Sequence, residues 1–340
     1  MALPFDQQIQ LAWRALSSSG DKEGWNTIPL YKKNNWLLVT GCSLSTNEQA
    51  IFLEINHSNI SISNNGLPIA QGFRVQQLKD DDSKKGLALI RQVDGDLELF
   101  TKMAVDVCNT IIQNETLNES QLISLFINRI NAWLSFMRKG FETLSQEAEL
   151  GLIGELETLS SLISANIPIS DVLDAWIGPL DGLKDFELGT GAIEIKSTLS
   201  SKGFIAKIGS LEQLDDSQIS PLFINGYRFS LNATGLTLVE RINLLRDQLI
   251  DFPSELSRLN NLLLRVGYLE TAAGNYIRKF KTENSFFWLV DENFPRLVPG
   301  NIAVNIRHAK YEIDLTPFIN QSIDLSLVLQ KLGIGNCGIN

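Results

Sequence analysis

The sequence predicts an α/β (α+β) protein in which a strand-rich N-terminal domain precedes a mixed sheet flanked by helices. Three observations indicate this class. Short apolar runs separated by Asn, Ser and Gly dominate residues 25–95, amphipathic helical patterns fill 97–165, and a hairpin pattern at 185–197 is followed by further strands and helices. We expect two domains, one over residues 1–115 and one over residues 116–340.

Length and composition are those of a globular protein without export or membrane signals. The chain has 340 residues, of which 44% are hydrophobic and 20% charged, enough for two separate cores. Its start has no basic leader before a long apolar run, and no stretch approaches about 18 uninterrupted apolar residues. Cys42, Cys108 and Cys337 are too widely spaced for a disulfide framework or a zinc pattern. These features predict a reduced, cytoplasmic setting without membrane contact.

The first third is predicted to hold strands between two helices, and it carries no chemical constellation. Ile9, Trp13 and Leu16 are spaced for one face of an N-terminal helix. The strands are expected at 36–40, 50–55 and 86–91, with a charged loop over 79–85 and a helix over 97–112.

The other two thirds are predicted to arrange helices and strands around one hairpin. A capping-box spacing at Thr116 and Glu119 marks the start of a helix that ends at Gly140. Next come a helix over 148–165, a turn-rich stretch over 168–184, and a hairpin of 185–188 and 192–197. The later strands are expected at 204–208, 222–231, 286–290 and 310–315, and the later helices at 238–249 and 255–266.

Acidic residues are concentrated in one block of the chain. The net charge is −10, and residues 141–200 hold 11 acidic residues against Lys184 and Lys196, a balance of −9. A negative chain is a poor DNA ligand by itself, because phosphate binding depends on Lys and Arg. The block is either a solvated face or a place where a cation supplies the missing charge.

The predicted hairpin groups two carboxylates with an ammonium. Successive strand residues alternate between faces, so Glu194 and Lys196 point to one side while Ile193 and Ile195 point to the other. A tight turn then brings Asp185, at the start of the preceding strand, near Glu194. Two carboxylates and an ammonium backed by apolar residues are a good site for a hard divalent cation.

A helical acid adds to this group. Glu155 lies three residues after Leu152 and four before Leu159, on the stripe that faces the core. A buried carboxylate is costly unless it is paired or bound to metal. Glu187 shares the hairpin's site face, and we expect it to be solvated. The alternative for Asp185, Glu194 and Lys196 is an exposed cross-strand salt bridge, and Glu155 favours the metal site over it.

The order of a helical Glu155, Asp185 and then Glu194-x-Lys196 resembles the PD-(D/E)XK nuclease superfamily of restriction endonucleases and resolvases. The segments GLIGEL (151–156), DAWIGP (174–179), KDF (184–186) and IEIK (193–196) are similar to those of PD-(D/E)XK motif proteins from bacterial restriction and phage-defence clusters. The resemblance covers most of the chain and implies a restriction-endonuclease-like fold. Lys184 stands where the superfamily name has proline, a position that varies among members.

The resemblance implies a metal-dependent endodeoxyribonuclease that hydrolyses phosphodiester bonds and leaves a 5′-phosphate and a 3′-hydroxyl. Asp185, Glu194 and Lys196 would be catalytic. Mg²⁺, or Mn²⁺ in its place, would be held by Asp185, Glu194, the carbonyl of Ile195, and Glu155. Lys196 would orient the attacking water or stabilise the transition state. The implied partners are DNA and other proteins of a defence system, and a homodimer is compatible with the sequence.

Several residues are candidates for contacts with DNA, although each also suits an ordinary polar surface. They are Ser197, Thr198, Lys202, Arg278, Lys279 and Lys281. Two rival functions stay open. One is a non-catalytic DNA-recognition or assembly subunit that keeps the nuclease fold, and the other is a structural protein whose acidic block binds a basic partner. Metal-dependent cleavage separates both from a nuclease.

Overall fold

The computed structural model describes residues 5–18, 24–33, 35–56, 67–78, 84–139 and 144–335. Most of the charged loop expected over 79–85 lies outside these residues, as does Cys337. The chain divides into two compact units, Met1–Gly140 and Phe141–Asn340, which we call the N-terminal and C-terminal units. No helix of the described residues is long and apolar enough to cross a bilayer.

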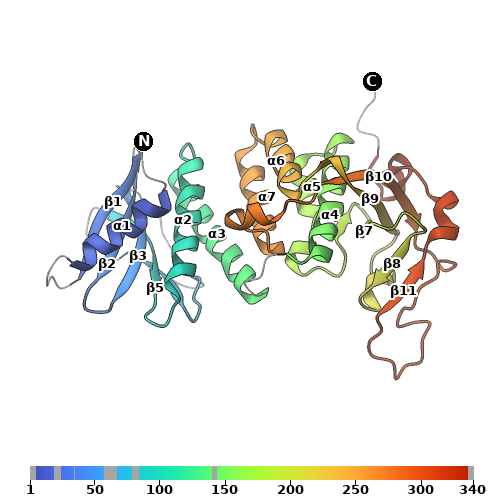
Figure 1. Ribbon diagram of the computed structural model, residues 1–340, viewed down its shortest axis with the longest axis horizontal. Coiled ribbons are helices and arrows are strands. Elements are labelled where there is room, and N and C mark those ends of the chain that lie inside the picture. The colour runs from blue at the N-terminus through green and yellow to red at the C-terminus, as the bar shows by residue number, and fades with distance from the viewer. Residues whose placement is uncertain are drawn as a thin grey trace. The chain divides into compact units, whose positions relative to one another are not determined.

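The N-terminal unit is an antiparallel sheet with helices (Figure 1). Its strand order is β1-β2-β3-β5-β4. The strands are β1 (Trp25–Lys33), β2 (Trp36–Ser43), β3 (Glu48–Asn56), β4 (Phe73–Gln77) and β5 (Lys84–Arg91), and the helices are α1 (Phe5–Ser18), α2 (Leu97–Gln113) and α3 (Glu119–Lys139). The stripe of Ile9, Trp13 and Leu16 on α1 is buried, as the sequence predicts.

Helix α3 belongs to the N-terminal unit, so the boundary between the units lies at 140/141 and not at 115/116. A partly buried polar contact joins α3 to α2 within this unit. Arg129 Nε and Nη2 donate to the Asp106 carboxylate at 2.6 and 2.7 Å, and Trp133 Nε1 donates to Asp106 Oδ2 at 2.6 Å. The cap of α3 also differs from the predicted one: Asn118 and Gln121 exchange side-chain and backbone hydrogen bonds, at 3.0 Å each.

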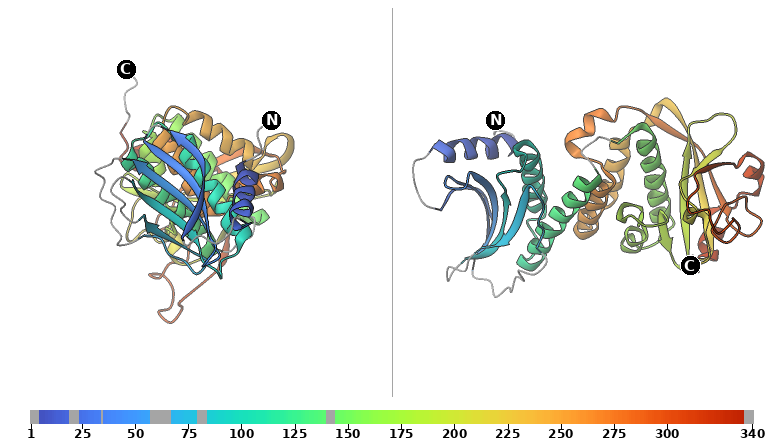
Figure 2. Two further views of the ribbon diagram at one scale, coloured as in Figure 1. Left: turned by 90° about the vertical axis from the view of Figure 1, so that its left-hand side faces the viewer. Right: turned by 90° about the horizontal axis from the view of Figure 1, so that it is seen from below.

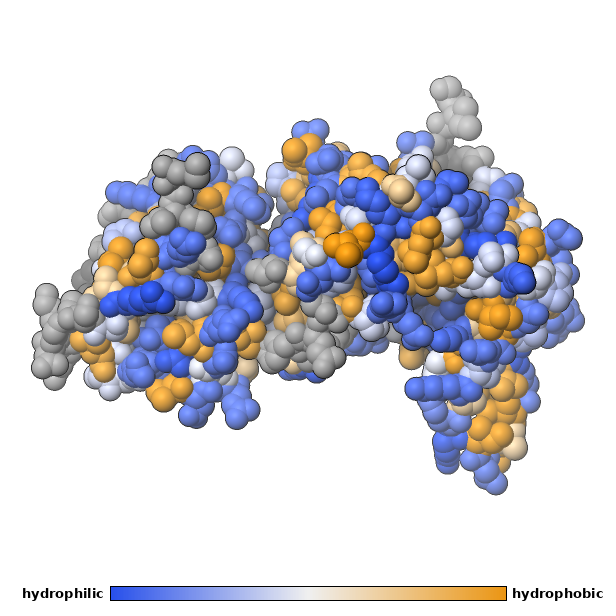
Figure 3. All heavy atoms as spheres, in the orientation of Figure 1, coloured by the Kyte–Doolittle hydropathy of each residue, from blue (hydrophilic) through white to orange (hydrophobic). Residues whose placement is uncertain are grey.

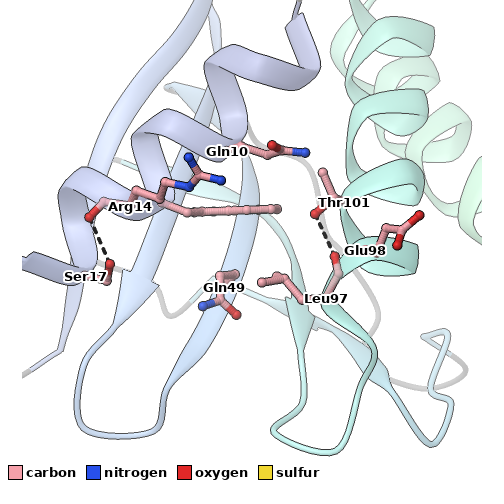
Figure 4. Close-up of a pocket in the computed structure, with 8 residues that line it drawn as sticks. Gln10, Arg14, Ser17, Gln49, Leu97, Glu98 and Thr101 are labelled. Atoms are coloured by element: carbon pink, nitrogen blue, oxygen red, sulfur yellow. Dashed lines mark hydrogen bonds between the residues drawn. The ribbon is translucent and has the colours of Figure 1, made fainter.

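The N-terminal unit contains a cavity of about 440 Å³ beside α1 and the start of α2 (Figure 4). Its lining is formed by Gln10, Trp13, Arg14, Ser17, Gln49, Leu97, Glu98 and Thr101. Glu98, the one carboxylate of that lining, is paired with Lys102 at 2.8 Å. The cavity therefore lacks the grouped acids of the predicted metal site.

The C-terminal unit is built on a four-stranded mixed sheet of order β10-β9-β7-β6. Its strands are β6 (Phe186–Leu188), β7 (Gly191–Thr198), β9 (Leu222–Leu236) and β10 (Phe280–Leu289). Strands β7 and β9 are parallel, and the β6/β7 and β9/β10 pairs are antiparallel. The hairpin predicted at 185–197 is thus formed by β6 and β7.

The two faces of this sheet have different covers (Figure 2). One face packs against α4 (Gln146–Ser164), α5 (Ile169–Ala175), α6 (Leu238–Gln248), α7 (Pro253–Val266) and α8 (Leu325–Lys331). The other packs against a small sheet of β8 (Ile205–Ile208) and β11 (Tyr311–Asp314). The predicted mixed sheet flanked by helices is confirmed. Helix α5 is a difference, because it occupies part of a stretch that was expected to be turn-rich.

Candidate active site

Strand β7 carries the centre of the site, and its residues alternate as the sequence predicts. Ile193 and Ile195 are buried in the core beneath the helices. Glu194 and Lys196 share the opposite face with Ala192, which packs in the core on the β8/β11 side. Glu194 is only 2% exposed, and Lys196 Nζ donates to Glu194 Oε1 at 2.8 Å. The pair is largely buried, unlike the exposed salt bridge that was the alternative.

Asp185 lies just before β6 and is fixed to β7 by a hydrogen bond. The backbone N–H of Ile195 donates to Asp185 Oδ2 at 2.6 Å. The carbonyl of Asp185 accepts from the N–H groups of Ile177 and Gly178, both at 3.0 Å. Burial raises the pKa of Asp185 well above its usual range, and repulsion from Glu194 and Glu155 adds to this effect. The structure therefore places Glu194 and Glu155 close enough to Asp185 for their charges to affect its protonation.

Glu155 reaches the site from α4. Trp176 Nε1 donates to Glu155 Oε2 at 2.6 Å. A Cβ atom on Gly178 would lie 3.3 Å from both Glu155 Oε2 and Asp185 Oδ1, so the two acids converge on this glycine. On the same helix Gly154 faces β7, where any side chain would collide with Ser197 Oγ. The absence of a side chain at Gly154 lets α4 lie close enough to the sheet for Glu155 to take part.

Lys196 is the positive group among these acids. Burial alone would lower the pKa of Lys196, but Glu194, followed by Asp185 and Glu155, outweighs burial and raises that pKa. Lys196 is therefore a cation at neutral pH. It can stabilise negative charge and cannot serve as a general base there.

The donor set suits a hard divalent cation. Asp185 and Glu194 supply carboxylate oxygens, the ligands that Mg²⁺ prefers, and a bound cation would relieve the repulsion that raises the pKa of Asp185. Among the described residues no three His, Cys, Asp or Glu side chains already form a metal cage. In the structure Glu194 accepts a hydrogen bond from Lys196, and Glu155 accepts one from Trp176. The side chain of Ile195 is buried, so only its backbone is available to the site.

A second lysine, Lys184, holds a loop against the site. It is 4% exposed, and its ammonium donates to the carbonyls of Glu212, Gln213 and Asp215 at 2.5, 2.8 and 3.0 Å. Burial lowers the pKa of Lys184, while Glu194 and the acids of the loop oppose this shift. The loop residue Gln213 in turn accepts from Lys196 Nζ at 3.4 Å. Lys184 therefore positions the loop that contacts Lys196.

These positioning residues were missed by the sequence analysis, except as marks of resemblance. In the sequence, Lys184 stands out as one of the two basic residues of the acidic block and as the residue at the proline position, and Trp176 and Gly178 only as part of the DAWIGP segment. Nothing in the sequence signals the role of Gln213, because its contact with Lys196 spans 17 residues. The position of Lys184 directly before the candidate ligand Asp185 was the one usable signal.

The three basic residues predicted to contact DNA around the start of β10 each form an ion pair within the chain. Arg278 Nη2 pairs with Glu149 at 2.5 Å, and its guanidinium lies 5.0 Å from the ring centroid of Phe280. Lys279 pairs with Glu240 at 3.6 Å, and Lys281 pairs with Glu283 at 3.3 Å. Both lysines keep close to half of their side-chain surface exposed, so their contact with DNA stays a prediction.

The other three candidates for DNA contact lie at or after the end of β7. Ser197 Oγ is buried and has no hydrogen-bond partner among the residues that the structure describes. Thr198 Oγ1 accepts from the backbone N–H of Ser200 at 3.1 Å, and Lys202 is exposed. Only Lys202 presents a charged group to solvent.

Part of the acidic block forms ion pairs within the chain. Four acids of residues 141–200 outside the site pair with basic residues that follow later in the sequence. The pairs are Glu147–Lys207, Glu149–Arg278, Glu157–Arg241 and Asp174–Arg258. Glu155, Asp185 and Glu194 differ from these four acids, because they lie together around one lysine, Lys196.

Comparison with known proteins agrees with this geometry. Residues 9–316 match a family model described as "Putative PD-(D/E)XK family member, (DUF4420)". No curated protein and no solved structure is matched by the chain. The matched region includes both the N-terminal sheet and the whole of the site. Because the match spans nearly the whole chain, this protein belongs to the DUF4420 family of PD-(D/E)XK proteins.

Proposed function

We propose that this protein is a Mg²⁺-dependent DNA nuclease in which Asp185, Glu194 and Lys196 are the reacting residues and Glu155 is a supporting acid. The observation that carries the proposal is the convergence of Asp185 and Glu155 on Gly178, next to the buried Glu194–Lys196 pair. A structural salt bridge does not need two further carboxylates, one of which, Asp185, has its pKa raised by burial and by repulsion from Glu194 and Glu155.

Each residue has a role that phosphodiester hydrolysis requires. Asp185, Glu194 and the carbonyl of Ile195 would hold the metal, and Glu155 would be the supporting acid beside them. When bound, Mg²⁺ supplies charge neutralisation at the phosphate and activation of a water. Lys196, which is protonated, places its ammonium where negative charge builds on the phosphoryl oxygens. Gln213 limits the directions in which that ammonium can point.

The biological setting belongs to the same proposal. We propose cleavage to a 5′-phosphate and a 3′-hydroxyl in the cytoplasm of a prokaryote, as part of a restriction or anti-phage system with other proteins. Support comes from the resemblance to proteins of such clusters and from the chain's net charge of −10, which leaves little basic surface for DNA. We propose target recognition as the role of the N-terminal unit.

Replacement of the site lysine tests the catalytic assignment. Lys196→Ala should reduce Mg²⁺-dependent nicking of plasmid DNA by about 10²–10³-fold, because it removes a preorganised charge from the transition state. The matched control is Lys102→Ala, which breaks a Lys–Glu contact of the same 2.8 Å length in the N-terminal unit. That variant should cleave as the wild type does. Equal cleavage by wild type and Lys196→Ala, or cleavage that persists in EDTA, would contradict the assignment.

A further inference from the structure

The C-terminal unit carries a projecting loop, residues 298–310, between β10 and β11. Figure 1 shows it extending beyond β8 and β11, without helix or strand. Tyr311 closes its neck. The backbone N–H of Leu297 donates to Tyr311 Oη at 3.0 Å, and that hydroxyl donates to the carbonyl of Leu297 at 3.2 Å. These two hydrogen bonds join Leu297 and Tyr311, so both ends of the loop leave the unit at the same place.

The projecting loop is basic in an acidic protein. Residues 298–310 contain Arg307, His308 and Lys310 and no Asp or Glu, whereas the whole chain has a net charge of −10. All three side chains are exposed. Unlike the cluster at 278–281, neither Arg307 nor Lys310 forms an ion pair within the described part of the chain. These charges are therefore available to an external anion.

The neck of the loop lies beside the active site. Arg296, just before the neck, donates from Nη1 to the carbonyl of Leu214 at 2.7 Å and pairs with Asp216 at 2.9 Å. Leu214 belongs to the same loop that Lys184 holds and in which Gln213 contacts Lys196.

The loop also exposes apolar side chains between its polar ones. Val304 is 84% exposed and Ile306 is 47% exposed, next to Arg307. Figure 3 shows hydrophobic and hydrophilic atoms side by side on this outgrowth. Exposed aliphatic side chains flanked by Lys and Arg are a combination that DNA-binding proteins place in the minor groove, with the cations on the phosphates.

We propose that the projecting loop is an arm that binds duplex DNA next to the bond to be cleaved. Arg307 and Lys310 contact phosphates, and Val304 and Ile306 lie against the groove. This inference rests on the proposed nuclease function and adds the surface that holds the substrate. Charge favours DNA over a protein partner, because a loop with two unpaired cations and no acids is complementary to a polyanion.

The test is a salt titration of DNA binding by the full-length protein. Binding of a fluorescent duplex is measured by anisotropy in EDTA, so that no cleavage takes place. Arg307→Ala/Lys310→Ala should bind about tenfold or more weakly, and the slope of log K against log salt should become shallower by about 1.8, as expected for two lost phosphate contacts. Lys102→Ala/Lys331→Ala removes the same charge from two exposed lysines outside the loop and should leave the slope unchanged. Val304→Ser/Ile306→Ser should weaken binding without changing the slope.

The outcomes separate this inference from the proposed function. If the wild type cleaves DNA and the Arg307/Lys310 variant keeps the wild-type affinity and slope, the proposal of a DNA-binding arm is wrong, and the proposed nuclease function is unaffected. That result would fit a loop that docks a protein. If the wild type neither binds nor cleaves DNA, both proposals fail. Circular dichroism melting of each variant verifies folding, and the exposure of all four side chains predicts unchanged melting temperatures.

Discussion

In Asp185→Asn we expect cleavage to fall at least about 10³-fold while the metal-free protein becomes more stable. The loss of activity follows because an amide is a poor ligand for Mg²⁺ and carries no charge. The gain in stability follows because burial and the nearby Glu194 and Glu155 raise the pKa of Asp185. The amide oxygen can still accept the hydrogen bond from Ile195. The gain should be about 1 kcal/mol, or roughly 2–4 °C in Tm for a unit of this size.

The pH dependence of this stability has a definite sign. A group whose pKa is raised in the folded state stabilises the fold while it is protonated, and the stability is lost as the pH rises through the folded-state pKa. The Tm difference between Asp185→Asn and wild type in EDTA should therefore widen with increasing pH. Asp174→Asn is the control, because Asp174 is an exposed acid paired with Arg258. A variant at Asp185 that melts below the wild type at every pH would contradict this view of the site.

The largest effect on stability is expected for Lys184→Ala. The substitution removes a buried ammonium whose three protons are donated to the carbonyls of Glu212, Gln213 and Asp215. Three carbonyls lose a charged donor, and hydrogen bonds to charged groups contribute about 1.5–3 kcal/mol each, less what water restores. We expect a loss of about 3 kcal/mol in the free energy of unfolding, measured by urea denaturation.

Activity should fall in Lys184→Ala as well, because the released loop carries Gln213, which contacts Lys196. Lys331→Ala, at an exposed lysine on the last turn of α8, is the control. It should change the free energy of unfolding by less than about 0.5 kcal/mol. A midpoint in Lys184→Ala that equals that of the wild type would show that the three hydrogen bonds do not support the fold.

The site could be predicted from sequence wherever local periodicity decides the geometry. Alternation along β7 separates Glu194 and Lys196 from Ile193 and Ile195, and a residue pair four apart on α4 places Glu155 inward. These constraints act within one strand or helix, or across one tight turn, so they can be predicted from a single sequence.

The parts that could not be predicted depend on contacts between distant segments. Arg278 reads as free basic surface in the sequence, yet it pairs with Glu149, which is 129 residues away. The same holds for α3, which the bond between Arg129 and Asp106 joins to α2 in the N-terminal unit. Helix α5 has seven residues, too few for a clear helical period in a stretch rich in turn formers.

The most direct test of the central claim is to measure Mn²⁺ binding to the purified full-length protein by isothermal titration calorimetry. It needs neither a DNA substrate nor a protein partner, so it examines the carboxylate cluster alone. We predict saturable binding to the wild type and to Asp174→Asn, and loss of this binding in Asp185→Asn, because Asp185, the proposed ligand, lies near both Glu155 and Glu194. Equal Mn²⁺ binding by wild type and Asp185→Asn, or no binding by either, would contradict a metal-dependent nuclease centre at this site.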